Sequence, residues 1–116
     1  MDYKLIVEDL LYCSQIYHEQ KSLNYKQDNL TFGSFGIAEN QLKKVESLLS
    51  GLSLDDLQKV RDCLAEEKNA KVEQYKVFKD AGNDLAYNQK MDILYSSFYD
   101  ANVFVIHYIN LARDKA

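Results

Sequence analysis

The sequence predicts an all-α fold, an antiparallel bundle of about four helices with a long C-terminal αα-hairpin. The 116-residue chain contains no proline and four glycines, so little in it interrupts a helix. Apolar residues recur at intervals of three and four along most of the chain, which is the period of a helix face. The length is that of one domain, so we expect a single domain over residues 1–116.

The first helix is expected over residues 2–22, where apolar side chains recur on one face. The segment 24–36 that follows is rich in turn-forming residues, including Gly33 and Gly36, and is expected to be the longest loop. A short β-hairpin within this segment is the alternative. The apolar face of the first helix is formed by Tyr3, Ile6, Leu10, Cys13 and Tyr17.

One glycine, Gly51, marks the break between the second helix and the third. The second is expected over residues 37–50 and ends at Gly51, which we expect to act as its C′ residue. The third begins after Ser53, which resembles the N-cap of a capping box with Asp56 in the place of glutamate. The pattern continues to Asp80, which predicts a long third helix.

The segment 81–84 is the last break before the fourth helix. Gly82 can close the third helix, and Asn83 or Asp84 can cap the fourth. The fourth helix takes the rest of the chain and is expected to be about 40 Å long at 1.5 Å per residue. Its main apolar face keeps the alternation of four and three: Tyr87, Met91, Leu94, Phe98, Ala101, Val105, Tyr108 and Ala112.

The first and fourth helices carry more apolar residues than one face requires. Large exposed apolar patches are rare on monomers, so these second stripes need a cover. The sequence leaves three possibilities open: the stripes are buried by packing within the chain, by a second copy of the chain or by another protein. The second stripe is Leu5, Tyr12, Ile16 and Leu23 on the first helix, and Ile93, Phe104 and Leu111 on the fourth, where Val103 lies within the polar face.

These stripes predict a non-enzymatic protein that acts stoichiometrically through protein–protein interaction, as an inhibitor, an adaptor or an immunity-type protein. The chain is rich in tyrosine and lysine, which is typical of AT-rich genomes and favours a phage or mobile-element origin. We expect the partner to be another protein or a second copy in a homo-oligomer. The residues selected for partner binding are Val103, Phe104, His107, Leu111, Tyr12 and Ile16.

An alternative function is the binding of a nucleotide or another small anion by a helical oligomer. Lys68 and Lys71 lie on the inward face of the third helix and would face Tyr95, Tyr99 and Asn102 across the hairpin. Lysines beside tyrosines can hold an anion by charge and hydrogen bonds. In the competing interpretation the hairpin projects into water, and the lysine stems lie on tyrosine rings.

Composition argues against several other classes. The net charge of −4 and the pI near 5.1 disfavour a general binder of nucleic acids or anionic membranes. Two cysteines fit a reducing compartment, and neither a signal peptide nor a membrane span is expected, so we infer a cytoplasmic location. No catalytic set and no cofactor are expected. No metal site is expected either, because Cys13, His18, Cys63 and His107 lack the spacing of a zinc module.

Overall fold

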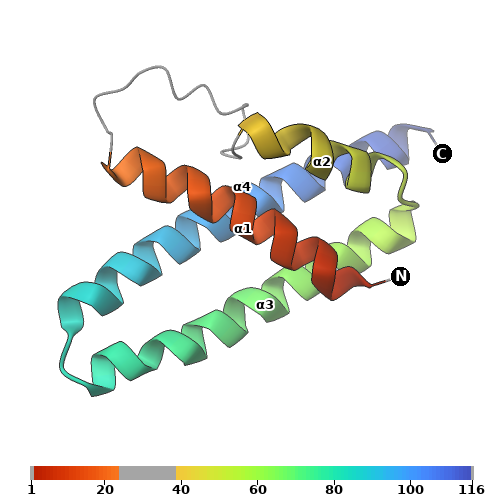
Figure 1. Cartoon of the computed structure of the whole chain (residues 1–116). Coiled ribbons are helices and arrows are strands. Elements are labelled where there is room, and N and C mark those ends of the chain that lie inside the picture. The colour runs from red at the N-terminus through yellow and green to blue at the C-terminus, as the bar shows by residue number, and fades with distance from the viewer. Residues whose placement is uncertain (1, 24–38, 116) are drawn as a thin grey trace.

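The computed structural model describes residues 2–23 and 39–115 and confirms the all-α fold, with no strand among these residues. The helices are α1 (Tyr3–Leu23), α2 (Glu39–Ser50), α3 (Leu54–Asp80) and α4 (Asp84–Lys115). The helices α3 and α4 form the predicted hairpin, α1 crosses it obliquely, and α2 lies against α1 and α4 (Figure 1). The segment 24–36, and with it the alternative of a β-hairpin, lies outside the described residues.

The turn between α2 and α3 is tight. Ser53 has an extended backbone, and its Oγ accepts a hydrogen bond of 3.1 Å from the backbone N–H of Asp56, which confirms the predicted N-cap. The prediction for Gly51 is wrong in one respect, because Gly51 does not have the positive φ of a left-handed C′ residue. Instead, the N–H of Leu52 bonds to the carbonyl of Leu49 at 3.2 Å, which tightens the last turn of α2.

The turn between α3 and α4 follows the prediction more closely. Gly82 has a φ of 76°. Its N–H bonds to the carbonyl of Lys79 at 3.0 Å, and the N–H of Asn83 bonds to the carbonyl of Phe78 at 2.8 Å, which is the Schellman pattern. The side chain of Asn83 then accepts a bond of 3.2 Å from the N–H of Ala86. Two adjacent residues therefore close one helix and cap the next.

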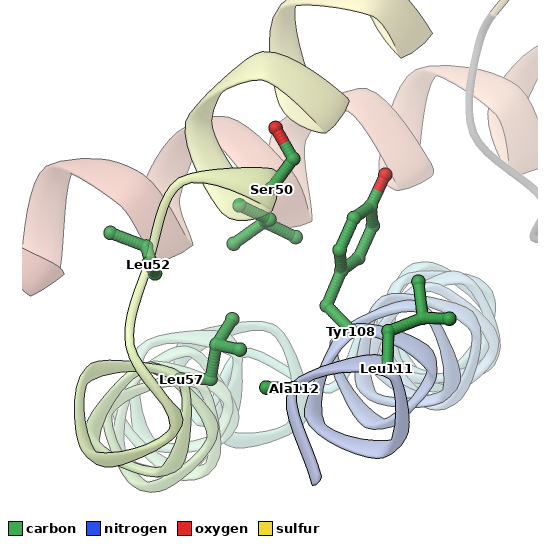
Figure 2. Close-up of a pocket in the computed structure, with 7 residues that line it drawn as sticks. Ser50, Leu52, Leu57, Tyr108, Leu111 and Ala112 are labelled. Atoms are coloured by element: carbon green, nitrogen blue, oxygen red, sulfur yellow. The ribbon is translucent and has the colours of Figure 1, made fainter. Parts of the chain in front are cut away.

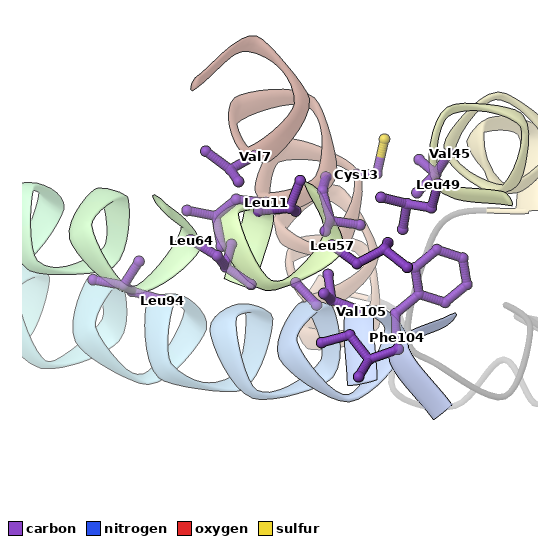
Figure 3. Packing of buried hydrophobic residues seen from close by; sticks show 14 of the residues in the cluster. Val7, Leu11, Cys13, Val45, Leu49, Leu57, Leu64, Leu94, Phe104 and Val105 are labelled. Carbon is purple, nitrogen blue, oxygen red and sulfur yellow. The ribbon is translucent and has the colours of Figure 1, made fainter. Parts of the chain in front are cut away.

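The hydrophobic core lies where α1 crosses the hairpin (Figure 3). All four helices contribute to it, and the small side chains of Ser14 and Ser97 are also fully buried. Fully burying an aliphatic or aromatic side chain stabilises the fold by about 1.5–3 kcal/mol, so this crossing is the main source of stability. The buried apolar residues are Val7, Leu10, Leu11, Cys13, Val45, Leu49, Leu57, Val60, Leu64, Met91, Leu94, Ala101, Phe104, Val105 and Ile109.

The hairpin projects beyond this core as an arm, residues 65–90, none of which is buried. Val72, Tyr75 and Tyr87 of the arm are partly buried against the core, and lysines lie over aromatic rings across the hairpin. The Nζ of Lys90 lies 5.3 Å from the ring centre of Phe78 and 5.6 Å from that of Tyr75, and the Nζ of Lys79 lies 5.5 Å from that of Tyr87. The ammonium groups thus lie within about 6 Å of the ring centres, where the positive charge is attracted to the ring faces.

Candidate functional site

An apolar pocket of about 210 Å³ opens at the end of the bundle opposite to the arm (Figure 2). It lies between the end of α2, the turn 51–53, the start of α3 and the last turns of α4. The residues that line it are Leu49, Ser50, Leu52, Leu57, Tyr108, Leu111 and Ala112.

The walls of the pocket follow from where the helices end. Because α2 ends at Ser50 and α3 begins directly after the cap at Ser53, both helix ends face the last turns of α4. Leu49 and Leu57 are each 1% exposed and form its buried floor. Tyr108 and Ala112 are half-buried, and Leu111 is 40% exposed at the rim. A buried floor and an accessible rim are typical of a surface that receives a side chain.

The chemistry of the pocket is that of an apolar receptor with few polar groups. Burial raises the pKa of the Tyr108 hydroxyl most, and the negative charge of Glu46 raises it further. This phenol is therefore neutral at physiological pH. The other side-chain hydroxyl belongs to Ser50. The volume is below the roughly 300 Å³ at which pockets for drug-sized ligands begin. These properties suit one large apolar side chain.

The residues of α4 selected for partner binding divide into two groups. His107 and Leu111 are exposed and Val103 is half-buried, so these three lie on the outer surface. Phe104, in contrast, is 1% exposed and packs in the core, with its ring edge-to-face against Tyr108 at 5.2 Å. The assignment of Phe104 to a binding surface is therefore wrong, because helices packed across α4 cover that part of the second stripe.

The second stripe of α1 is only partly covered. Tyr12 is 60% exposed, Leu5 is 59% exposed and Ile16 is half-buried. Tyr12 borders a shallow groove between α1 and α3 that is mostly polar. Two of its carboxylates are paired with lysines, Glu8 with Lys4 at 3.9 Å and Asp9 with Lys44 at 3.4 Å. The groove is lined by Glu8, Asp9, Tyr12, Gln15, Glu67 and Lys71.

The residues of the alternative anion site border different grooves, since Tyr95 and Tyr99 line the groove beside His18 and Lys71 lines the groove between α1 and α3. The Nζ of Lys68 lies over the rings of Phe98, at 5.0 Å, and Tyr95, at 5.9 Å. Lys71 instead borders the groove between α1 and α3, and Asn102 is half-buried on α4. The ammonium group of Lys68 on α3 therefore lies over aromatic rings of α4.

The sequence analysis missed an interhelical pair. Nε2 of His18 on α1 and Oδ2 of Asp100 on α4 are 2.5 Å apart, and both side chains are largely buried. The pair borders an open groove that Tyr95, Ser96 and Tyr99 also line. Nothing in the periodicity signals this pair, because the two residues are 82 positions apart. The hydrogen bond fixes the C-terminal half of α1 on the hairpin.

Within residues 2–23 and 39–115 there is no group of three or more His, Cys, Asp or Glu side chains arranged to hold a metal ion. Cys13 and Cys63 form no disulfide bond, and burial raises the pKa of each thiol. None of the described helices has the length and continuous hydropathy that a membrane span requires. Comparisons of the chain with protein-family models, curated proteins and solved structures found no match.

Proposed function

We propose that this chain is a non-enzymatic protein that acts stoichiometrically by binding another protein at the apolar pocket. The observation that supports the proposal is the pocket itself, which has a buried floor of Leu49 and Leu57 and an exposed rim at Leu111. Binding energy at protein interfaces concentrates where a large side chain fills such a pocket. Stoichiometric binding of this kind fits an inhibitor, an adaptor or an immunity-type protein.

The partner that fits is a protein that presents one leucine, methionine or phenylalanine from a helix or a turn. The pocket volume of about 210 Å³ suits such an anchor better than a cofactor. His107 and Leu111 are both exposed on the same part of α4 and would contact the residues that surround the anchor. The pocket is thus bordered by one polar and one apolar exposed side chain. Protein interfaces have such a partly polar rim around an apolar centre.

The test is affinity capture from the source cells with the wild-type chain and two variants. Leu111→Glu places a charge at the rim of the pocket. Leu85→Glu is the matched control, because Leu85 is 70% exposed on the arm, at the other end of the molecule. We expect a partner that the wild type and Leu85→Glu retain and Leu111→Glu loses, with unchanged circular dichroism for all three.

The captured partner is then titrated calorimetrically. We expect one partner per chain and weaker binding by Ala112→Phe, which fills the pocket from the wall. A partner that binds Leu111→Glu and Ala112→Phe as tightly as the wild type would contradict the proposal, and so would the absence of any specific partner.

A further inference from the structure

A second stripe of residues at helical spacing on α4 lies beside the apolar face that packs against α3. Tyr95, Tyr99, Asn102, Ile106 and Asn110, here called the outer stripe, follow one another at intervals of four, three, four and four. At 100° per residue they fall within an arc of about 80°. Tyr99 is 68% and Tyr95 is 50% exposed, Asn110 is exposed, and Asn102 and Ile106 are half-buried. The stripe is therefore accessible along its whole length.

The outer stripe is uncharged between two residues of opposite charge. Asp92 precedes it and Arg113 follows it on the same face of the helix, and both side chains are exposed. Between them α4 carries one Asp, Glu, Lys or Arg residue, Asp100, and that carboxylate bonds to His18 on α1. Interface centres are depleted of charge and enriched in tyrosine, which is the composition of this stripe.

We propose that the outer stripe is the interface of a homodimer, in which α4 packs antiparallel against α4 of a second copy. The charges at its two ends select the orientation. In a parallel pair, Asp92 would lie beside the same aspartate of the second copy and Arg113 beside the same arginine. In the antiparallel pair each Asp92 meets the Arg113 of the second copy, and both ion pairs form at once.

The register follows from the same pairing. If residues 92 and 113 are opposite each other, the two-fold axis passes between Asn102 and Val103. Tyr99 then faces Ile106 of the second copy, and Tyr95 faces Asn110, so a phenol can donate a hydrogen bond to an amide oxygen. Asn102 lies next to the axis, where a polar residue in an apolar face can fix the register.

The interface is small, and the dimer is therefore in reversible equilibrium with the monomer. From Asp92 to Arg113 the helix rises by about 32 Å, and a strip one helix wide, about 10 Å, buries roughly 600 Å² over the two copies. Interfaces of less than about 1,200 Å² belong to weak, transient complexes. The outer stripe is also separate from the apolar pocket, so this inference does not depend on the proposed function.

The test is sedimentation equilibrium over a wide range of protein concentration at low ionic strength, where exposed ion pairs are least screened. We expect a monomer–dimer equilibrium for the wild type. Asp92→Arg and Arg113→Asp should each raise the dissociation constant at least about tenfold, because each change places like charges together at both ends of the interface. The double variant should restore dimerisation to near the wild-type level.

Asp62→Arg is the matched control, since Asp62 is an exposed carboxylate on α3 and its reversal should leave the equilibrium unchanged. Circular dichroism checks that each variant is folded, which is expected for exposed positions. A wild type that stays monomeric at every concentration would overturn the proposal. Single reversals without effect, or a double variant as weak as the single ones, would overturn the antiparallel register.

Discussion

The hydroxyl of Tyr3 on α1 donates a hydrogen bond of 2.6 Å to Oδ1 of Asp56 in the first turn of α3. It joins the start of α1 to the same turn that Ser53 caps. The bond holds the pKa of Asp56 below its usual range and raises the pKa of Tyr3, because it favours an ionised carboxylate and a protonated phenol. The two shifts together define the pH range in which the contact stabilises the fold.

Replacing Tyr3 by phenylalanine should lower the free energy of unfolding by an amount that depends on pH. The carboxyl of Asp56 has a lower pKa in the folded state, so its contribution is present above about pH 4 and is lost as the pH falls through the folded pKa. The phenol of Tyr3 has a higher pKa in the folded state, so its contribution is present below about pH 10 and is lost above the folded pKa.

Urea unfolding of the wild type and Tyr3→Phe across this range is the measurement. The difference in stability should be constant near neutral pH and shrink at both extremes. Tyr12→Phe is the control, because Tyr12 is also on α1 but is 60% exposed. A difference between wild type and Tyr3→Phe that does not change with pH would show that the lost contact is not this hydrogen bond.

The two glycines at helix ends should respond differently to alanine. Gly82 has a φ of 76°, which costs a residue with a β-carbon about 1–2 kcal/mol. Gly51 lacks a positive φ, and an added β-carbon would meet nothing within 4 Å. Gly51→Ala should therefore change stability little or increase it by up to about 1 kcal/mol. Urea unfolding of both variants checks this, and equal losses would contradict it.

The same comparison shows what the sequence can predict about helix ends. Gly51 and Gly82 each follow a run of apolar residues spaced at three and four, and both breaks are correctly placed from that pattern. The spacing of apolar residues does not specify the backbone conformation of the glycine that follows. At Gly82 the next two residues start another helix and the chain needs a left-handed residue, whereas a bond between Leu52 and Leu49 turns the chain after Gly51.

Phe104 and Leu111 should differ strongly when truncated, although both belong to the predicted second stripe of α4. Phe104 is 1% exposed, and Phe104→Ala should cost about 3–5 kcal/mol through lost burial and a cavity. Leu111 is 40% exposed, and Leu111→Ala should cost less than about 1 kcal/mol. Chemical denaturation of both variants is the measurement, and similar losses would show that Phe104 is not a core residue.

Periodicity could not separate these two residues. It correctly predicts the face of α4 that meets α3, because neighbouring antiparallel helices repeat their contacts every seven residues. The oblique path of α1 has no such repeat, since it crosses α4 at one place (Figure 1). The second stripe is covered by packed helices at Phe104 and accessible at Leu111, and the crossing angle that decides this is not in the pattern.

The bond between His18 and Asp100 should appear as a coupling in a double-mutant cycle. Side-chain exposure is 16% for His18 and 25% for Asp100, so the contact is shielded from water. We expect His18→Ala and Asp100→Asn to be non-additive by about 1–2 kcal/mol at neutral pH. The exposed Lys4–Glu8 pair is the control and should couple by less than about 0.5 kcal/mol. Additive losses for His18 and Asp100 would contradict the prediction.

Backbone amides of the arm should exchange with solvent faster than those of the same helices within the core. Residues 65–90 include no buried side chain, and segments with few buried contacts open at low free-energy cost. Lys90→Ala should accelerate exchange further, because the ammonium of Lys90 on α4 lies over the rings of Tyr75 and Phe78 on α3. Lys76→Ala is the control, since the ion pair of Lys76 is with Glu73 on its own helix. Hydrogen exchange read by mass spectrometry tests both expectations, and uniform protection along α3 would show that the lysine–aromatic contacts stabilise the arm as firmly as the core.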